Sequence, residues 1–435
     1  MSELIEYTSP IPDGWEIMNF NETYTSVTLN KIKIKQKDYL TIGNYPVVDQ
    51  GQELIGGYFD NIQYVIKEEP PFLVFGDHTK VKKFINFKFV AGADGVKVLK
   101  PIKHINPKLL FFFLHCFKIP DRGYARHFQF LNNAEFPLPP LAEQQRIVAK
   151  IEELFSELDK GIETLKTAKQ QLKVYRQAVL KYAFEGKLTN PTVVEGELPD
   201  GWVSKSLKEL TIKAEKVKFR EKNLDDEFYY LDIGGIDNIR NKIVGHKTYK
   251  WRDAPSRAQQ IVLFKDILFS TVRTYLKNVA QINDDKFNNQ ICSSGFTVIR
   301  ANENTDSDYL FKYVLYQGFL TPLNELQTGT SYPAVRDEDV LSQLIKLPIG
   351  KDEQIKIIQE IESRLSVCDN IEESIEQGLQ QAEVLRQSIL KKAFEGKLVS
   401  QDPDDEPASE LLKRIKAELT KAQPVKKTKT KKVKA

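Results

Sequence analysis

The chain is poor in cysteine and has no long apolar run. Its 435 residues include three cysteines, Cys116, Cys292 and Cys368, which are far apart and odd in number. This pattern argues against a disulfide framework and a cysteine metal site, and it favours buried thiols in a reducing compartment. No stretch approaches the ~18 consecutive apolar residues of a membrane-spanning helix, and residues 1–10 lack the basic and apolar parts of a signal peptide. We therefore expect a cytoplasmic protein without a membrane segment.

An excess of charge of one sign is also missing. The formal net charge is +3, and residues 424–435 contain six lysines and no acid, so the rest of the chain carries −3. The body of the protein is not basic overall, and any nucleic-acid surface must therefore be local. The lysine-rich tail has low complexity and almost no apolar residues, and we expect it to be disordered.

Motifs for catalysis are not found either. The phosphate-binding pattern G-x-x-x-x-G-K-[ST] is absent, because Gly186-Lys187 and Gly396-Lys397 are followed by leucine and have no upstream glycine. The nearest match to an adenine-methyltransferase motif, residues 190–192, lacks the second proline and the aromatic residue. Five histidines are scattered without metal-ligand spacing. We expect no catalytic residues and no metal site, and a nuclease with unrecognised motifs is kept as an alternative that metal-dependent cleavage by the purified chain would reveal.

What the chain does contain is an internal repeat. Each copy has a variable segment, then a helical segment, then the same stop sequence. The helical segments align without gaps, whereas the variable segments align poorly, which indicates one duplicated scaffold that carries two diverged modules. The recurring motifs are Pro12-Asp13-Gly14-Trp15 with Pro199-Asp200-Gly201-Trp202, Glu143-Gln144 with Glu353-Gln354, and Ala183-Phe184-Glu185-Gly186-Lys187-Leu188 with Ala393-Phe394-Glu395-Gly396-Lys397-Leu398.

The two helical segments have the apolar spacing of a coiled coil, with steps of mainly three, four or seven residues. Each runs for about 40 residues, or about 60 Å, and a glycine suits its end. The second helix starts at the second module, so we expect it to run back antiparallel to the first and to end near the first module. The seam residues are Ile147, Ile151, Leu154, Leu158, Ile162, Leu165, Leu172, Tyr175, Val179 and Tyr182, followed by Ile358, Ile361, Leu365, Cys368, Ile371, Ile375, Leu379, Ala382, Leu385 and Ile389.

Both variable segments, residues 12–140 and 199–348, combine strand and helix patterns. In the first we expect strands at 45–48, 72–75 and 96–99 and an apolar helix or strand at 109–117. In the second we expect strands at 228–233, 266–270 and 295–299 and a helix at 308–320. The predicted fold class is α+β, with two mixed α/β modules separated by a pair of long antiparallel coiled-coil helices in a pseudo-two-fold repeat.

Clusters of cations, aromatics and amides occur in both modules. Arginine can bind guanine with two hydrogen bonds, glutamine or asparagine can bind adenine, and lysine or serine can bind a phosphate. A solvated or structural role is equally compatible with each residue taken singly. The candidate DNA contacts are His78, Lys80, Arg122, Tyr124, Arg126, Arg257, Arg273, Tyr275, Lys277, Ser331, Tyr332 and Arg336.

Several motifs together resemble the specificity subunit of type I restriction–modification systems, across nearly the whole chain. Copy two departs from the family pattern where Leu347-Pro348-Ile349-Gly350 replaces the Pro-Pro-Leu-Ala entry to the helix, which leaves the start of that helix open. The matching residues are 138–147, the two Ala-Phe-Glu-Gly-Lys-Leu stops, 75–79, 268–273, 329–335 and 402–409.

The resemblance implies two target-recognition domains that read the halves of a split, asymmetric site in double-stranded DNA. It implies two methyltransferase subunits docked on the helices, and translocase–nuclease restriction subunits. S-adenosylmethionine, ATP and Mg would serve those partners, and we expect no cofactor in this chain. The expected division is 1–141 and 189–350 for the recognition domains, 142–188 and 351–400 for the central and distal helices, and 401–435 for a C-terminal segment. A coiled-coil adaptor that binds only proteins is the alternative from another class, and a sequence-specific DNA-binding assay separates the two.

Overall fold

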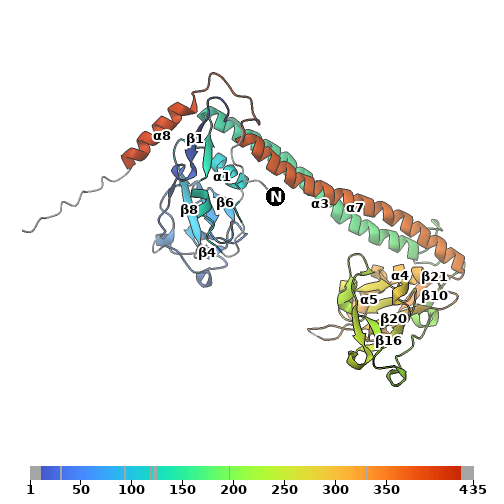
Figure 1. Ribbon diagram of the computed structural model, residues 1–435. Coiled ribbons are helices and arrows are strands. Elements are labelled where there is room, and N and C mark those ends of the chain that lie inside the picture. The colour runs from blue at the N-terminus through green and yellow to red at the C-terminus, as the bar shows by residue number, and fades with distance from the viewer. Residues whose placement is uncertain are drawn as a thin grey trace, which may run out of the picture. The chain divides into compact units, whose positions relative to one another are not determined.

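Figure 1 shows the computed structural model of the chain, which describes residues 11–29, 32–92, 95–117, 119–120, 125–132, 134–194, 196–329 and 331–422. The lysine-rich tail, for which the sequence predicts disorder, lies outside the described residues. The chain divides into two compact units, unit 1 with residues 1–164 and 378–435 and unit 2 with residues 165–377. Within the described part, no helix is long and apolar enough to cross a membrane.

Unit 1 contains a four-stranded antiparallel sheet in the order β2-β8-β5-β6, a three-stranded sheet in the order β4-β3-β7, and the pair β1-β9. Helix α1 (Pro107–Cys116) places Leu109, Leu110 and Phe113 in the core, and the short helix α2 spans Gln129–Asn132. The strands are β1 (Glu16–Asn19), β2 (Tyr24–Ser26), β3 (Tyr45–Val48), β4 (Gly57–Phe59), β5 (Phe72–Gly76), β6 (Lys82–Ile85), β7 (Val90–Ala91), β8 (Val96–Pro101) and β9 (Glu135–Leu138).

Unit 2 has two four-stranded sheets, in the orders β11-β20-β17-β18 and β15-β12-β19-β16, and the pairs β10-β21 and β13-β14. Its short helices are α4 (Ser307–Val314), α5 (Gln317–Glu325) and α6 (Asp337–Leu341). The strands are β10 (Trp202–Ser206), β11 (Thr211–Ile212), β12 (Glu227–Leu231), β13 (Ile236–Asp237), β14 (Lys242–Ile243), β15 (Lys247–Lys250), β16 (Ala258–Val262), β17 (Ile267–Ser270), β18 (Val279–Gln281), β19 (Gln290–Ser293), β20 (Phe296–Ala301) and β21 (Leu344–Pro348).

The two units repeat one topology although their sequences align poorly. Strand β3 pairs antiparallel with β4 and parallel with β7, and β12 pairs in the same way with β15 and β19. The sheet β2-β8-β5-β6 corresponds to β11-β20-β17-β18, and the pair β1-β9 to β10-β21. The duplicated scaffold inferred from the motifs therefore extends through the modules themselves.

Two helices of 44 residues each, α3 (Leu141–Phe184) and α7 (Lys351–Phe394), have residues in both units. Their pairing is antiparallel wherever they meet. In unit 1, Arg386 of α7 pairs with Asp159 and lies over the ring of Phe155, 4.5 Å from its centre. In unit 2, Lys169 pairs with Glu376 at 2.8 Å and Arg176 with Asp369 at 2.7 Å. The mixed fold and the antiparallel direction expected from the sequence are confirmed. The second long helix, whose start the sequence left open, begins at Lys351.

Part of the seam is more exposed than its spacing predicts. Ile147, Ile151, Cys368 and Ile375 are buried, as a seam requires. The side chains of four other seam residues are exposed, because a pair of helices buries only a narrow stripe of each. These four are Tyr175, Tyr182, Ile371 and Leu385.

Two further differences concern helices. The helix expected over 308–320 is broken into α4 and α5, because Tyr316 adopts an extended backbone and its ring packs 5.7 Å from the ring of Phe184 at the end of α3. Where the sequence left helix or strand open for 109–117, residues up to Cys116 belong to helix α1. The C-terminal segment contains an unforeseen helix, α8 (Ala408–Ala422), which buries Leu411 and Ile415 in the core of unit 1.

Candidate nucleic-acid interface

The recurring motifs of unit 1 meet at one structural corner. The indole N–H of Trp15 donates to Glu143 Oε2 at 2.8 Å. The amide of Gln144 accepts from the backbone N–H of Asn106 at 2.8 Å and donates to the carbonyl oxygen of Pro139 at 3.1 Å. Gly396 has φ +66, and a Cβ there would lie 2.3 Å from Cγ of Pro12. The end of α7 therefore rests on the first module, as expected from the chain order.

Unit 2 builds the same corner from the second copy of each motif. Trp202 donates to Glu353 Oε1 at 3.3 Å, and Gln354 bonds to the backbone of Asp306 and Pro348 at 2.8 and 3.0 Å. Gly186, with φ +76, lies against Pro199 and Trp202. These motifs thus fix each module to a helix end, which leaves the divergent turns of the modules as the candidate reading surface.

In unit 2, two candidate clusters far apart in the sequence form one surface. The turn 271–277 after β17 pairs with residues 333–335 through backbone hydrogen bonds, including Arg273 N–H to the carbonyl oxygen of Pro333 at 2.8 Å and Val335 N–H to that of Thr271 at 3.0 Å. Arg273 and Lys277 both adopt a left-handed backbone, with φ 50 and 56. This backbone brings Arg273 beside Ser331 and Tyr332, and Tyr275 in the same turn is exposed.

Arg273 is held in position by the facing strand. Its guanidinium donates to the carbonyl oxygen of Ser331 at 2.9 Å and lies 4.9 Å from the ring centre of Tyr332. The Tyr332 residue itself is 72% exposed. A planar cation stacked on an exposed ring suits contact with a base or a phosphate, because fewer rotamers must be frozen on binding.

Unit 1 repeats this arrangement after the equivalent strand β5. The turn 77–81 lies against residues 125–128, because the carbonyl oxygen of Asp77 accepts from His127 N–H at 2.9 Å and its carboxylate accepts from Phe128 N–H at 2.8 Å. Lys97 lies 3.8 Å from the same carboxylate. Asp77 is therefore a structural residue, and it joins the cluster of His78 and Lys80 to the segment that carries Arg126.

The remaining candidates are placed less uniformly. Arg126 and Arg257 are exposed. The carbonyl oxygen of Arg257 accepts a hydrogen bond from the backbone N–H of Ser294, and that of the neighbouring Gly295 accepts one from Thr271. Arg336 has its guanidinium on Asp339 at 2.7 Å, which raises the pKa of the arginine and lowers that of the carboxyl. Burial lowers the pKa of Lys277. Two candidates, Arg122 and Tyr124, lie outside the described residues.

Comparison with known proteins agrees with this arrangement. A family model described as the type I restriction modification DNA specificity domain matches residues 12–173. The specificity subunit of the type I restriction enzyme EcoDI from Escherichia coli is 26% identical over 337 residues, which cover 69% of this chain and 73% of that protein. Residues 12–173 thus match a type I restriction modification DNA specificity domain, and most of the chain is similar to a type I specificity subunit.

Solved structures share the fold of this chain. A chain solved for the complex assembly and conformational transition of the type I R-M system aligns with a TM-score of 0.66 at 18% identity, covering 89% of this chain and 100% of that one. The crystal structure of the HsdS subunit from Thermoanaerobacter tengcongensis aligns with a TM-score of 0.53 at 18% identity, covering 90% and 99%.

Unit 2 has a further element beside this surface that the sequence did not single out. The hairpin β13-β14 is attached to the turn by Asn238, whose amide donates to the carbonyl oxygen of Leu276 at 2.9 Å, and by Asn241, which donates to that of Lys277 at 3.1 Å. Its tip presents Ile239, which is 89% exposed, next to Arg240. The sequence around Asn238 and Asn241 gave no local signal for this hairpin, because its attachment depends on contacts with a turn 38 and 36 residues away.

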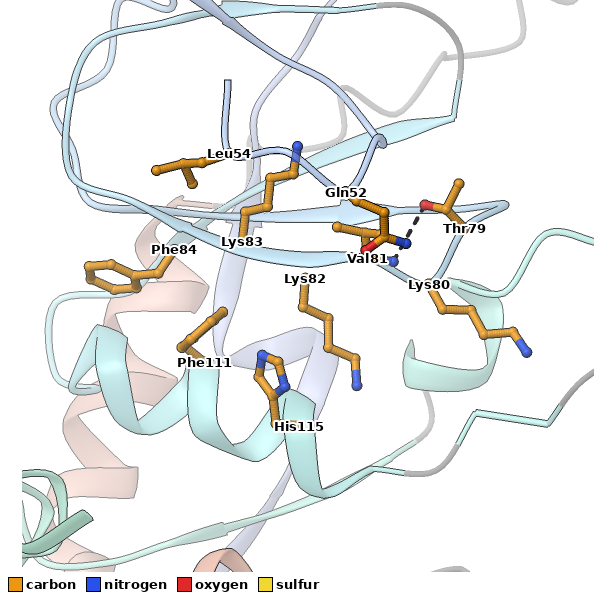
Figure 2. Close-up of a pocket in the computed structure, with 10 residues that line it drawn as sticks. All are labelled: Gln52, Leu54, Thr79, Lys80, Val81, Lys82, Lys83, Phe84, Phe111 and His115. Atoms are coloured by element: carbon orange, nitrogen blue, oxygen red, sulfur yellow. Dashed lines mark hydrogen bonds between the residues drawn. The ribbon is translucent and has the colours of Figure 1, made fainter. Parts of the chain in front are cut away.

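The described part of the chain has a cavity in unit 1 but no candidate metal site. The described residues contain no group of three or more His, Cys, Asp or Glu side chains placed to hold a metal ion. Unit 1 has a cavity of about 610 Å³ beside the turn 77–81, which is lined by Gln52, Leu54, Thr79, Lys80, Val81, Lys82, Lys83, Phe84, Phe111 and His115 (Figure 2). Lys82 was not among the sequence candidates.

Proposed function

We propose that this chain is a specificity subunit that reads a bipartite, asymmetric target in double-stranded DNA, with one half-site for each module. The observation that carries the proposal is the repeated topology of the two units, in which the equivalent turns bear different side chains. Unit 1 offers His78, Lys80 and Arg126, whereas unit 2 offers Arg273 and Tyr332. Equal scaffolds with unequal reading surfaces are what a target with two different halves requires.

The proposed role includes placing the other subunits on DNA. The relatives are named as specificity subunits of restriction enzymes, and adenine methylation and ATP-dependent cleavage are assigned here to partner methyltransferase and restriction subunits. S-adenosylmethionine, ATP and Mg would be used by those partners. We further propose two methyltransferase subunits for each chain, because the same corner of module and helices is built twice, and a cytoplasmic location, where the DNA target is found.

An exchange of one module tests the proposal. Residues 12–140 are replaced by the corresponding segment of a relative with a known target, and the methylated motif is mapped by long-read sequencing of the host genome. One half of the motif should change to that of the donor, while the other half is kept. The matched exchange of residues 199–348 should change only the opposite half.

Two outcomes would contradict this function. A change in both halves after either exchange would show that the modules do not read independently. Loss of the gene without any change in genomic methylation would show that the chain does not direct a methyltransferase.

A further inference from the structure

The cavity of unit 1 is strongly cationic. Its lining includes three lysines, Lys80, Lys82 and Lys83. None of the described lining residues is acidic. The charge of Lys83 is neutralised, because its buried amine lies 3.7 Å from the carboxylate of Asp49. Lys82 has no hydrogen bond or ion pair with any described residue, so its charge is available to a ligand.

Two elements of unit 1 direct polar groups into the same space. Figure 2 shows Lys82, from β6, extending beside the ring of His115, from α1, while Lys83 points to the other side of the strand. This follows from the alternation of side chains along a strand. Burial lowers the pKa of His115 to about 4, with the charges of Lys82 and Arg386 adding to the effect, so the imidazole is neutral at pH 7. It can donate one hydrogen bond without adding charge.

The cavity has an apolar side and opens onto the proposed reading surface. Leu54, Phe84 and Phe111 form the apolar part of its lining. Thr79 and Lys80 belong both to the lining and to the turn that lies against residues 125–128. A ligand that fills it should therefore combine an anion with carbon-rich surface, and it should arrive along the face that carries Arg126.

From this geometry we propose that the cavity is a binding site for the DNA backbone, with Lys82 contacting one phosphate and the apolar wall contacting the adjoining deoxyribose. The inference rests on the proposed function, since it assigns a sugar–phosphate contact to the first module. Such a contact fixes the position of a module on the duplex and carries no base preference itself. Unit 2 has the hydrophobic Val279 at the strand position that corresponds to Lys82, next to its own turn. The site is thus specific to the first module.

Lys82 gives the contact a characteristic pH dependence. Burial lowers the pKa of Lys82 to about 8. A bound phosphate favours the protonated amine, so affinity should be constant well below pH 8 and should fall as the pH rises above about 8. The groups around Lys82 are Lys80 on the same hairpin, His115 and Cys116 on α1, and Arg386 beyond them, whereas Asp49 and Glu53 interact with Lys83. The neutral His115 and the Cys116 thiol, whose pKa burial raises strongly, do not titrate in this window.

The test uses the full chain assembled with its methyltransferase partner and a duplex that contains the mapped motif. We expect Lys82→Gln to weaken binding by roughly tenfold at low salt, to reduce the salt slope by about 1 without a change of motif, and to abolish the fall above pH 8. Lys82→Arg should keep the affinity and lose the pH dependence. The matched control is Lys103→Gln, which removes the same charge at the opposite end of the sheet, after β8, and should leave the salt slope and pH profile of the native chain.

A scan of neutral methylphosphonates identifies the phosphate and separates the DNA backbone from a free anion. One position should weaken binding of the native chain and have no effect on Lys82→Gln, as expected of two groups in contact. If every position weakens both proteins equally, or if Lys82→Gln binds like Lys103→Gln, the inference is wrong. A native assembly that fails to prefer its motif over a scrambled duplex would instead contradict the proposed function.

Discussion

Arg273 lies in the turn after β17, and Arg126 lies in the segment that faces the corresponding turn of unit 1, so the two residues can serve as controls for each other. Arg273→Ala should affect only one half-site, and Arg126→Ala only the other. A lost base contact should cost about 1–3 kcal/mol and relax one position, whereas a lost phosphate contact should weaken all sequences and reduce the salt slope by about 1. Binding titrations over duplexes with single substitutions, at several salt concentrations, measure both effects.

The position of Arg273 over the ring of Tyr332 allows a second, more specific test of the Arg273 contact. Tyr332→Ala should reproduce part of the Arg273→Ala defect, because the guanidinium then loses its ring and keeps only the Ser331 carbonyl. Tyr332→Phe should bind like the native chain if the ring alone matters. If neither arginine substitution alters affinity, salt dependence or base preference, both residues are removed from the interface.

At the scale of single residues, the sequence predicted which residue types take part better than it predicted how their side chains are arranged. It singled out 271–277 and 329–336 separately, and the backbone pairing of Val272 with Ala334 and its neighbouring hydrogen bonds, which join them, appear only in the structure. It could not show that Arg336 is engaged by Asp339 as part of a helix cap, nor that Lys83 pairs with Asp49 whereas Lys82, which lines the same cavity, lies beside His115. These outcomes depend on which strands become neighbours, and one sequence does not encode that locally.

Among the elements, the two long helices and the strands β3, β5 and β8 were predicted closely, because their apolar spacing is strong and regular. Elements shaped by contacts with distant residues were not. The break between α4 and α5 follows from the packing of Tyr316 on Phe184, and α8 becomes a helix whose apolar face covers the core of unit 1. The exposure of Tyr175 and Leu385 likewise depends on how wide the helix–helix contact is.

The helix ends provide a stability prediction. Gly396→Ala should destabilise the protein by about 1–3 kcal/mol, because φ +66 disfavours any other residue and the new Cβ meets Pro12 at 2.3 Å. Gly161→Ala is the matched control, since Gly161 lies within α3 with no atom of another element within 4 Å of its would-be Cβ. It should raise stability by up to about 1 kcal/mol. Thermal unfolding of the three proteins gives the comparison, and equal midpoints for both variants would refute the corner as a stabilising joint.

At the scale of the whole molecule, the duplicated corners predict stoichiometry. Each combines a Trp–Glu hydrogen bond, a Gln bound to two backbone groups, and a glycine helix end. Similar surfaces bind similar partners, so native mass spectrometry should detect two methyltransferase subunits for each chain. A complex that saturates at one to one, even with excess methyltransferase, would contradict this expectation.

The long helices also predict that spacer length is adjustable. Because α3 and α7 each have residues in both units, an equal insertion in both lengthens the connection while keeping their antiparallel register. Seven residues added after Ala168 and seven after Gly378 preserve the heptad phase and add about 10 Å at 1.5 Å per residue. At about 3.4 Å per base pair, the methylated motif should gain up to about three base pairs of spacer with both half-sites unchanged.

An insertion in one helix alone is the control for this experiment. It displaces pairs such as Arg176 with Asp369 and Lys169 with Glu376 on one side only, and it should reduce assembly rather than lengthen the spacer. The doubly extended variant must be active for the test to decide, which its overall methylation level reports. An active variant with the original spacer would show that the helices do not set the distance, because the added length would then have been absorbed without moving the readers along the duplex.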